Sequence, residues 1–167
     1  MITQTARKIS ILALTVTMLA LVSACSSQPV DSTARTTSQK SAVRGQSVGE
    51  RAASVALLQV GAPYRYGGAT TGGFDCSGLV QYSYRHAGKD LPRTTGQQWS
   101  STTTVERDEL QAGDLLFFRI EGKMSHVGMY VGRQQFVHAP SSGRTVTVAK
   151  LTSPFYASAL IRAGRPK

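Results

Sequence analysis

The chain has 167 residues, with 19 Lys and Arg against 9 Asp and Glu, and a formal net charge of +10. At about 150 residues per domain, this length accommodates one folded domain and short additional segments. Hydrophobic residues make up 41% and charged residues 17%, which is typical of a globular protein and excludes a disordered polyelectrolyte. The 2 cysteines exclude a disulfide framework and a four-thiolate zinc site.

Residues 1–24 have the layout of a secretory signal. Arg7 and Lys8 supply a positive start, an apolar run follows over residues 9–22, and small residues precede Cys25. This order of charge, apolar core and cleavage site is typical of signal peptides. A transmembrane helix needs about 20 predominantly apolar residues, and this run is shorter. We therefore expect the chain to be exported.

The end of this segment resembles the lipobox of bacterial lipoproteins, because it closes on a cysteine. The resemblance implies cleavage after Ala24 and lipidation of Cys25, whose acyl chains would hold the protein on a membrane without a spanning helix. Ser26 stands where an inner-membrane retention signal has Asp. In a cell with two membranes, we expect attachment to the periplasmic face of the outer membrane. Cys76 is then left as a single free thiol.

Export also bears on the meaning of the positive charge. A basic surface usually indicates nucleic acid, but the polyanions outside the cytoplasm are cell-wall carboxylates and anionic lipid headgroups. We expect no nucleic-acid partner, and an equal alternative is a charge surplus that only keeps the protein soluble.

Residues 25–46 predict a lipidated flexible tether, and residues 47–167 a folded domain. The tether is rich in Ser and Thr and has no aromatic residue, so it cannot bury enough apolar surface to offset the entropy of ordering. Ser47 and Glu50 form a capping box at the start of a first helix, which residues 61–63 terminate. Its apolar side is expected to comprise Ala52, Ala53, Val55, Ala56, Leu57 and Val60.

Further elements follow in order. Asp75 is suited to cap a second helix that ends near Gly88, and Thr94 or Thr95 opens a short third helix through Trp99. Beyond residue 113 the period changes to that of strands, predicted over 114–119, 126–131, 135–139, 145–149 and 160–163. Helices followed by an antiparallel sheet of about five strands predict an α+β fold.

Cys76, His126 and His138 are the residues whose chemistry stands out. Cys76 lies in the first turn of the second helix, where unpaired N–H groups and the helix dipole lower a thiol pKa. A hairpin turn centred on Gly132 would place His126 opposite His138, whereas a turn centred between two residues would put them on different faces. Two polar imidazoles in otherwise apolar strands favour the register with a shared face. Thiolate, imidazole base and an orienting group would then suffice for nucleophilic catalysis.

Other readings of these residues are open. A free cysteine is often a plain buried hydrophobe, and a lone strand histidine is usually a core or surface residue. One cysteine and two histidines could also hold zinc, although the short ligand spacing of zinc motifs is absent.

Six short sequence blocks occur in order along the chain: residues 63–68, 74–80, 91–95, 110–115, 125–130 and 136–139. Through these blocks the chain resembles the NlpC-type cysteine peptidases of bacterial cell walls. Residues 74–80 match the nucleophile motif of that family, 125–130 its base strand and 136–139 its second-histidine strand. The resemblance covers about residues 47–161 and implies a papain-like domain.

The resemblance also implies roles for individual residues. Cys76 would be the nucleophile, His126 the base and acid, and His138 the orienting residue. The positions of Tyr64, Asp75 and Ser125 match residues near the oxyanion and substrate, although Asp75 could be only a helix cap and Tyr64 could only pack the loop. Arg93 could bind a substrate carboxylate or form a structural salt bridge.

The implied activity is hydrolysis of peptide bonds in peptidoglycan stems or cross-links by a lipid-anchored monomer, with no metal or organic cofactor. Alternatives are a non-catalytic wall-binding lipoprotein and an acyl or amide transferase on the same fold.

Overall fold

The structure is a computed structural model that describes residues 45–167. The predicted signal, the lipidated Cys25 and the tether up to residue 44 lie outside the described residues. Within residues 45–167, no helix has the length and apolarity that crossing a membrane requires.

The first described helix, α2 (Val48–Leu57), begins at the predicted capping box. The backbone N–H of Glu50 donates to Ser47 Oγ over 3.1 Å, and the N–H of Ser47 donates to Glu50 Oε2 over 2.7 Å. Three alanines form the buried face of α2: Ala52, Ala53 and Ala56. The prediction that Leu57 and Val60 extend this face is wrong, because their exposed fractions are 40% and 49%. Leu57 is the last residue of α2 and lies at its exposed end, and Val60 lies in the turn that follows.

The second and third predicted helices are confirmed. Helix α3 (Cys76–His86) is capped by Asp75, whose carboxylate accepts the N–H of Gly78 over 2.7 Å. It is followed by Gly88 in the left-handed region with φ of +89°, as is common where a helix ends. Helix α4 (Thr95–Ser100) begins after Thr94, which caps it in a second capping box.

Six antiparallel strands form the main sheet in the order β3-β8-β4-β5-β6-β7. Five of them confirm the predicted strands: β4 (Leu115–Ile120), β5 (Lys123–Gly132), β6 (Gln135–His138), β7 (Thr147–Lys150) and β8 (Leu160–Pro166). The sequence reading missed the edge strand β3 (Thr102–Val105), the small hairpin of β1 (Ala69–Thr70) and β2 (Gly73–Phe74), the turn η1 (Arg107–Glu109) and the helix α5 (Pro154–Ala159). The α+β fold class is confirmed.

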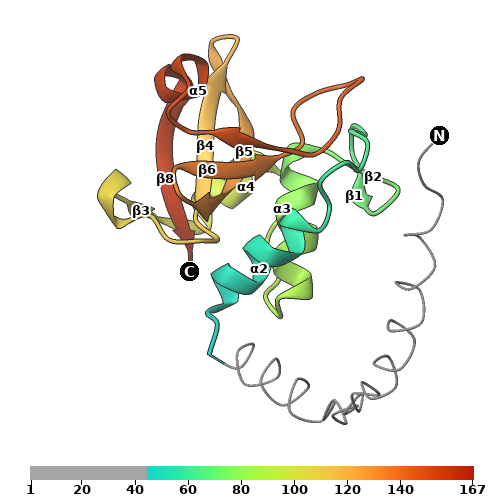
Figure 1. Ribbon diagram of the computed structural model, residues 1–167, viewed down its shortest axis with the longest axis horizontal. Coiled ribbons are helices and arrows are strands. Elements are labelled where there is room, and N and C mark those ends of the chain that lie inside the picture. The colour runs from blue at the N-terminus through green and yellow to red at the C-terminus, as the bar shows by residue number, and fades with distance from the viewer. Residues whose placement is uncertain (1–44) are drawn as a thin grey trace, which may run out of the picture. The chain divides into compact units, whose positions relative to one another are not determined.

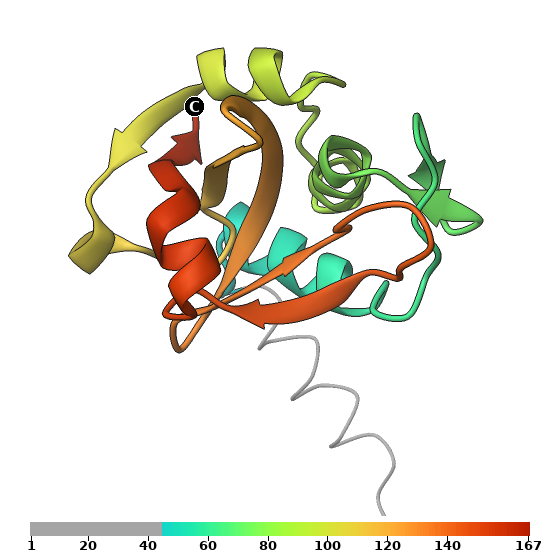
Figure 2. The same cartoon turned by 90° about the horizontal axis from the view of Figure 1, so that it is seen from above.

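The two faces of the sheet carry different layers. Helices α2 and α3 lie side by side on one face (Figure 1), where they pack on alternate residues such as Phe117, Val127 and Met129. Helix α5 covers the other face, where Phe118 and Phe136 form a smaller core. Figure 2 shows the helices and the sheet from above. The strict alternation along β4 and β5 therefore separates the two cores, as expected for strands buried on both sides.

The loop between β6 and β7 reaches back to the segment that precedes β1 (Figure 1). The N–H of Tyr64 donates to the carbonyl of Arg144 over 2.8 Å, and the N–H of Gly61 donates to the carbonyl of Val146 over 2.9 Å. These bonds fix residues 61–64 beside the start of α3.

Candidate active site

Asp75 holds the start of α3 in place. One carboxylate oxygen accepts the N–H of Gly78, and the other accepts the N–H of Gly67 over 3.0 Å. The guanidinium of Arg93 binds the same carboxylate at both oxygens, with N···O distances of 2.9 and 2.6 Å. Of the two roles open for Arg93, the structure shows the structural ion pair, a bidentate geometry that is strong and directional. Asp75 is thus a cap and an ion-pair partner that orients the helix carrying Cys76.

Two glycines bring the loop and the helix into direct contact. The carbonyl of Gly68 accepts the N–H of Asp75 over 3.0 Å, and a Cβ at Gly78 would overlap this carbonyl. Glycine at position 78 therefore lets the loop before β1 approach the first turn of α3.

The thiol of Cys76 is half-buried at the first position of α3. Its hydrogen-bond partners among residues 45–167 are Thr95 Oγ1 at 3.8 Å and the carbonyl oxygen of Ser125 at 3.9 Å, and no hydrogen bond joins it to an imidazole. The residue that follows Ser125 is His126, so the sulfur lies beside the backbone of the predicted base.

The prediction of a lowered thiol pKa is wrong. Burial raises the pKa of Cys76 above its ordinary value, and this effect outweighs the backbone N–H groups of Val127 and Ser77 and the hydroxyl of Thr95, which act in the opposite direction. A position in the first turn of a helix favours a thiolate, but the burial of the sulfur depends on segments distant in sequence.

His126 and His138 share a face of the sheet and are hydrogen-bonded, with 2.8 Å between Nε2 of His126 and Nδ1 of His138. The predicted shared face is confirmed, but the predicted direct opposition is wrong. Met129 pairs with Val137, and continuing this register places His138 opposite Gly128, two residues from His126. The imidazoles meet diagonally, with ring centroids 5.0 Å apart.

A β-bulge produces this register. Tyr130 pairs with Phe136 and Gly132 with Gln135, so two steps along β5 match one step along β6 and Val131 is the extra residue. The hairpin itself closes through Arg133 and Gln134, whose φ angles are 53° and 54°. A two-residue turn without the bulge would have put the histidines on different faces, because a shift of one residue exchanges the faces of a strand.

Both imidazoles are neutral in this environment. His126 and His138 are 5% and 1% exposed. Burial lowers the pKa of His126 to about 4. Burial, and then the nearby charges of His126 and Arg144, lower the pKa of His138 to about 3. The resting site therefore combines a thiol with two neutral imidazoles.

Tyr156 is a site residue that the sequence reading missed. Its Oη lies 3.3 Å from Nε2 of His138, the nitrogen that does not contact His126. Tyr156 lies on α5, an element that carries no strong periodic signal. The Pro154 that occupies the first turn of α5 was the available sign of a helix start.

A groove of about 420 Å³ opens beside the thiol. It is lined by the predicted nucleophile Cys76 and by the three residues predicted to lie near the oxyanion and substrate: Tyr64, Asp75 and Ser125. Burial raises the pKa of Tyr64, and the charges of Cys76 and Asp75 act in the same direction. The phenol is consequently a hydrogen-bond donor at neutral pH. The groove can accommodate an extended peptide along the start of α3.

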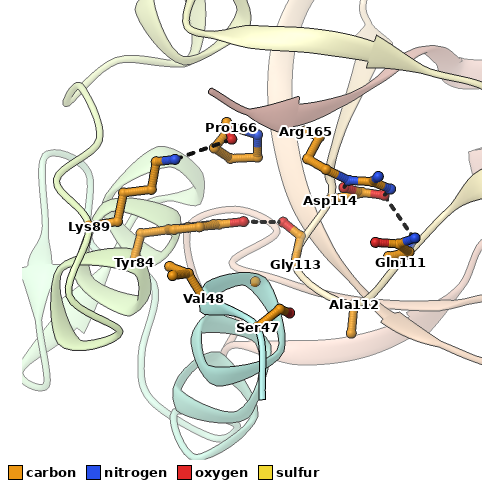
Figure 3. A pocket seen from close by; sticks show the side chains of 11 residues that line it. Ser47, Val48, Tyr84, Lys89, Gln111, Ala112, Gly113, Asp114, Arg165 and Pro166 are labelled. Carbon is orange, nitrogen blue, oxygen red and sulfur yellow. Dashed lines mark hydrogen bonds and ion pairs between the residues drawn. The ribbon is translucent and has the colours of Figure 1, made fainter. Parts of the chain in front are cut away.

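A separate cavity of about 210 Å³ lies where α2 and α3 meet the loop before β4 (Figure 3). Its polar groups are engaged with one another. Tyr84 Oη donates to the carbonyl of Gly113 over 2.8 Å, and Arg165 forms a bidentate pair with the buried Asp114. We interpret this cavity as a structural junction between the helical layer and the sheet.

The described residues also bear on metal binding. Among residues 45–167, no three His, Cys, Asp or Glu side chains are grouped in a way that could hold a metal ion.

Comparison with known proteins agrees with this geometry. The sequence model of the NlpC/P60 family matches residues 61–165, and the chain belongs to this family. A structure of an NlpC/P60 family protein from Bacillus cereus ATCC 10987 superposes with a TM-score of 0.66 and 32% identity, over 71% of this chain and 40% of that chain.

Two curated relatives extend the comparison. The murein DD-endopeptidase MepH of Escherichia coli K12 is 40% identical over 106 residues, which are 60% of this chain and 39% of MepH. The gamma-D-glutamyl-L-lysine dipeptidyl-peptidase of Bacillus subtilis 168 is 39% identical over 100 residues, 58% of this chain and 34% of that protein. The chain therefore spans about two fifths or less of the length of these relatives.

Proposed function

We propose that this protein is a cysteine endopeptidase that hydrolyses peptide bonds of peptidoglycan. The observation that carries the proposal is the arrangement of Cys76 in the groove, beside the backbone of a strand whose His126 is hydrogen-bonded to a buried His138. Family membership and relatives named for murein and gamma-D-glutamyl peptide cleavage support the substrate class.

The reaction would begin from neutral partners. As the sulfur of Cys76 attacks the carbonyl carbon, its proton passes to Nδ1 of His126, because Nε2 of that ring is engaged with His138. A carbon–sulfur bond forms, and the carbonyl electron pair moves to the oxygen. The carbon–nitrogen bond then breaks as the imidazolium of His126 donates its proton to the leaving amine.

Hydrolysis of the thioester would complete the cycle. Water attacks the acyl carbon while His126 accepts a proton from it. The carbon–sulfur bond breaks, and the sulfur recovers a proton. His138 stabilises the transient imidazolium and holds the ring in position, as the third member of a catalytic triad does.

The oxyanion requires donors near the sulfur. The backbone N–H of Cys76 is at the first position of α3, where no intrahelical acceptor is in reach, so it can bind the oxyanion. Tyr64 lines the same groove as a protonated phenol, which makes it a second candidate donor.

Lipid anchoring at Cys25 and an outer-membrane location are part of the same proposal and rest on the signal-like residues 1–24 and the cysteine that follows them. Radiolabelled palmitate fed to cells should enter the wild-type protein and not the Cys25→Ala variant. Equal labelling of both proteins would contradict this part of the proposal.

The substrate is tested with purified sacculi. The wild-type protein should release fragments whose masses show cleavage of a peptide bond, and the fragment ends identify that bond. Release of fragments cut only in the glycan strands would contradict the proposal. Products joined to an added amine in place of water would instead indicate acyl transfer, and binding of sacculi without any release would indicate a non-catalytic wall-binding protein.

A further inference from the structure

The outer nitrogen of His138 has a specific partner. Nε2 of His138 lies 3.3 Å from Tyr156 Oη, while Nδ1 of the same ring contacts His126. Two imidazoles and a phenol thus form a continuous chain that runs from β5 across β6 to α5. The catalytic scheme proposed above uses the first two members and leaves the phenol without a role.

The ring of Tyr156 is held in place by its neighbours. Its centroid lies 4.9 Å from that of Phe136 and 5.5 Å from that of Phe118, both in edge-to-face geometry. Phe118 and Phe136 are completely buried. A ring clamped in this way presents its hydroxyl to His138 at a fixed position.

The direction of the hydrogen bonds in this chain decides which nitrogen of His126 is free. If His138 carries its proton on Nε2 and donates it to Tyr156, its Nδ1 accepts the Nε2–H of His126. Nδ1 of His126 then has no proton and can accept the one from Cys76. If Tyr156 donates instead, every proton in the chain reverses, and Nδ1 of His126 is already occupied.

The hydroxyl oxygen of Tyr156 can accept a hydrogen bond from His138 because its own hydrogen can be donated to a different acceptor. The phenol also lines an open cavity of about 400 Å³, together with His138, Arg144 and Thr147. Solvent in this cavity can accept the hydroxyl proton, which leaves a lone pair on Oη for the Nε2–H of His138.

We propose that Tyr156 is a positioning residue that accepts the Nε2–H of His138 and thereby keeps Nδ1 of His126 free to take the proton of Cys76. This role rests on the proposed peptidase function. The hydroxyl acts through His138 and touches neither substrate nor reacting atoms.

The tautomers can be read directly in the wild-type protein. Long-range ¹H–¹⁵N spectra of the purified full chain at pH 7 should show His126 and His138 both protonated at Nε2 and bare at Nδ1, with assignments made from His126→Asn and His138→Asn variants. A wild-type His138 protonated at Nδ1 would overturn the proposal. This measurement needs no active enzyme, so it is readable even if peptidoglycan is not the substrate.

Tyr156→Phe tests the consequence for catalysis. The variant keeps the ring and its aromatic contacts but removes the protein acceptor of the Nε2–H of His138, whose side chain is 1% exposed, and this disfavours that tautomer. We expect kcat to fall about tenfold or more, KM to change little, and the Nδ1–H form of His138 to become detectable.

The matched control is Tyr130→Phe. Tyr130 is a buried tyrosine on the same face of the sheet, and its hydroxyl accepts the N–H of Gln134 over 3.3 Å. This variant loses the same atom without touching the histidines, so both kcat and the tautomers should stay at wild-type values. Equal effects of the two substitutions, or unchanged tautomers in Tyr156→Phe, would show a merely structural role. If wild-type tautomers match the expectation but no peptide bond is cut, the proposed function fails while the hydrogen-bond assignment stands.

Discussion

Nε2 of His126 and Nδ1 of His138 are 2.8 Å apart although the two residues are not cross-strand partners. The contact depends on the single extra residue, Val131, that the bulge inserts into β5. Bulges are frequent beside active sites because they redirect a side chain. Here the bulge compensates for a turn that would by itself have separated the histidines.

The turn beyond the bulge is strained, and its relief should stabilise the protein. Arg133 and Gln134 both adopt φ near +54°, which costs residues other than glycine and asparagine roughly 1 kcal/mol each. Replacing them with Asn and Gly relieves about 2 kcal/mol of strain, of which the greater freedom of glycine in the unfolded chain removes about 0.5–1 kcal/mol. The free energy of unfolding, measured by urea denaturation, should therefore rise by about 1 kcal/mol, with the activity unchanged. Arg133→Lys keeps the strain and should have no effect. A destabilised Asn-Gly variant would contradict this account of the turn.

Reactivity of the thiol should report a protonated resting state. Burial raises the pKa of Cys76 above its ordinary value of 9.0, and only the thiolate is alkylated. The rate of reaction with iodoacetamide should be low at pH 7 and still rising at pH 9. A rate that reaches its plateau below pH 8 would show a preformed thiolate and contradict a resting state with a neutral Cys76 thiol and a neutral His126 imidazole.

Acid should affect catalysis at an unusually low pH. His126 must be neutral to accept a proton, and burial lowers its pKa to about 4. The acid limb of kcat/KM, which reports the free enzyme, should therefore have its midpoint near pH 4 to 5 rather than near the ordinary 6.5. A midpoint at or above 6.5 would contradict the assignment of a buried neutral base.

The lowered histidine pKa values also make the free energy of unfolding depend on pH in the acid range. The unfolded chain binds protons on both histidines below about pH 6.5, whereas the folded protein resists protonation down to about 4. The unfolded state therefore holds more protons in this window, so the free energy of unfolding falls as the pH drops through it. Circular dichroism recorded alongside the rates separates this loss of structure from protonation of the base.

The approach of the loop to the nucleophile helix is tested at Gly78. A Cβ at this position would overlap the carbonyl of Gly68, so Gly78→Ala should displace the first turn of α3 and cost roughly 1–3 kcal/mol of stability. We expect a marked loss of activity, measured on the same peptide substrate as the wild type.

The control for this variant is Gly96→Ala in α4, where an added Cβ meets no atom within 4 Å. It should leave activity unchanged and stabilise the helix by about 0.5–1 kcal/mol. Similar behaviour of the two variants would show that the packing of Gly78 against Gly68 has no bearing on the site.

Local signals in the sequence predicted much of the fold. Ser47 with Glu50, and Asp75 with Gly88, mark helix ends through bonds between residues close in sequence. The positions of Cys76, His126 and His138 on their elements followed from these signals and from strand alternation.

Features that depend on tertiary contacts could not be predicted in this way. Gly132, with a φ of +90°, is the residue-type signal at the bulge, but Arg133 and Gln134 are not residues that usually adopt positive φ, so residue types do not show where the hairpin closes. The raised pKa of Cys76 results from burial by segments distant in sequence. The contact of Tyr156 with His138 exists because α5 packs on the face of the sheet opposite α2 and α3. Short helices of this kind depend on packing more than on helix propensity.

The most direct test of the central claim is the cleavage rate of a purified cross-linked muropeptide, compared between the wild type and Cys76→Ala by chromatography and mass spectrometry. We predict that the variant loses activity by at least about 1,000-fold while its melting temperature stays close to that of the wild type. A folded Cys76→Ala protein that retains more than about a tenth of the wild-type rate would show that the sulfur is not the nucleophile.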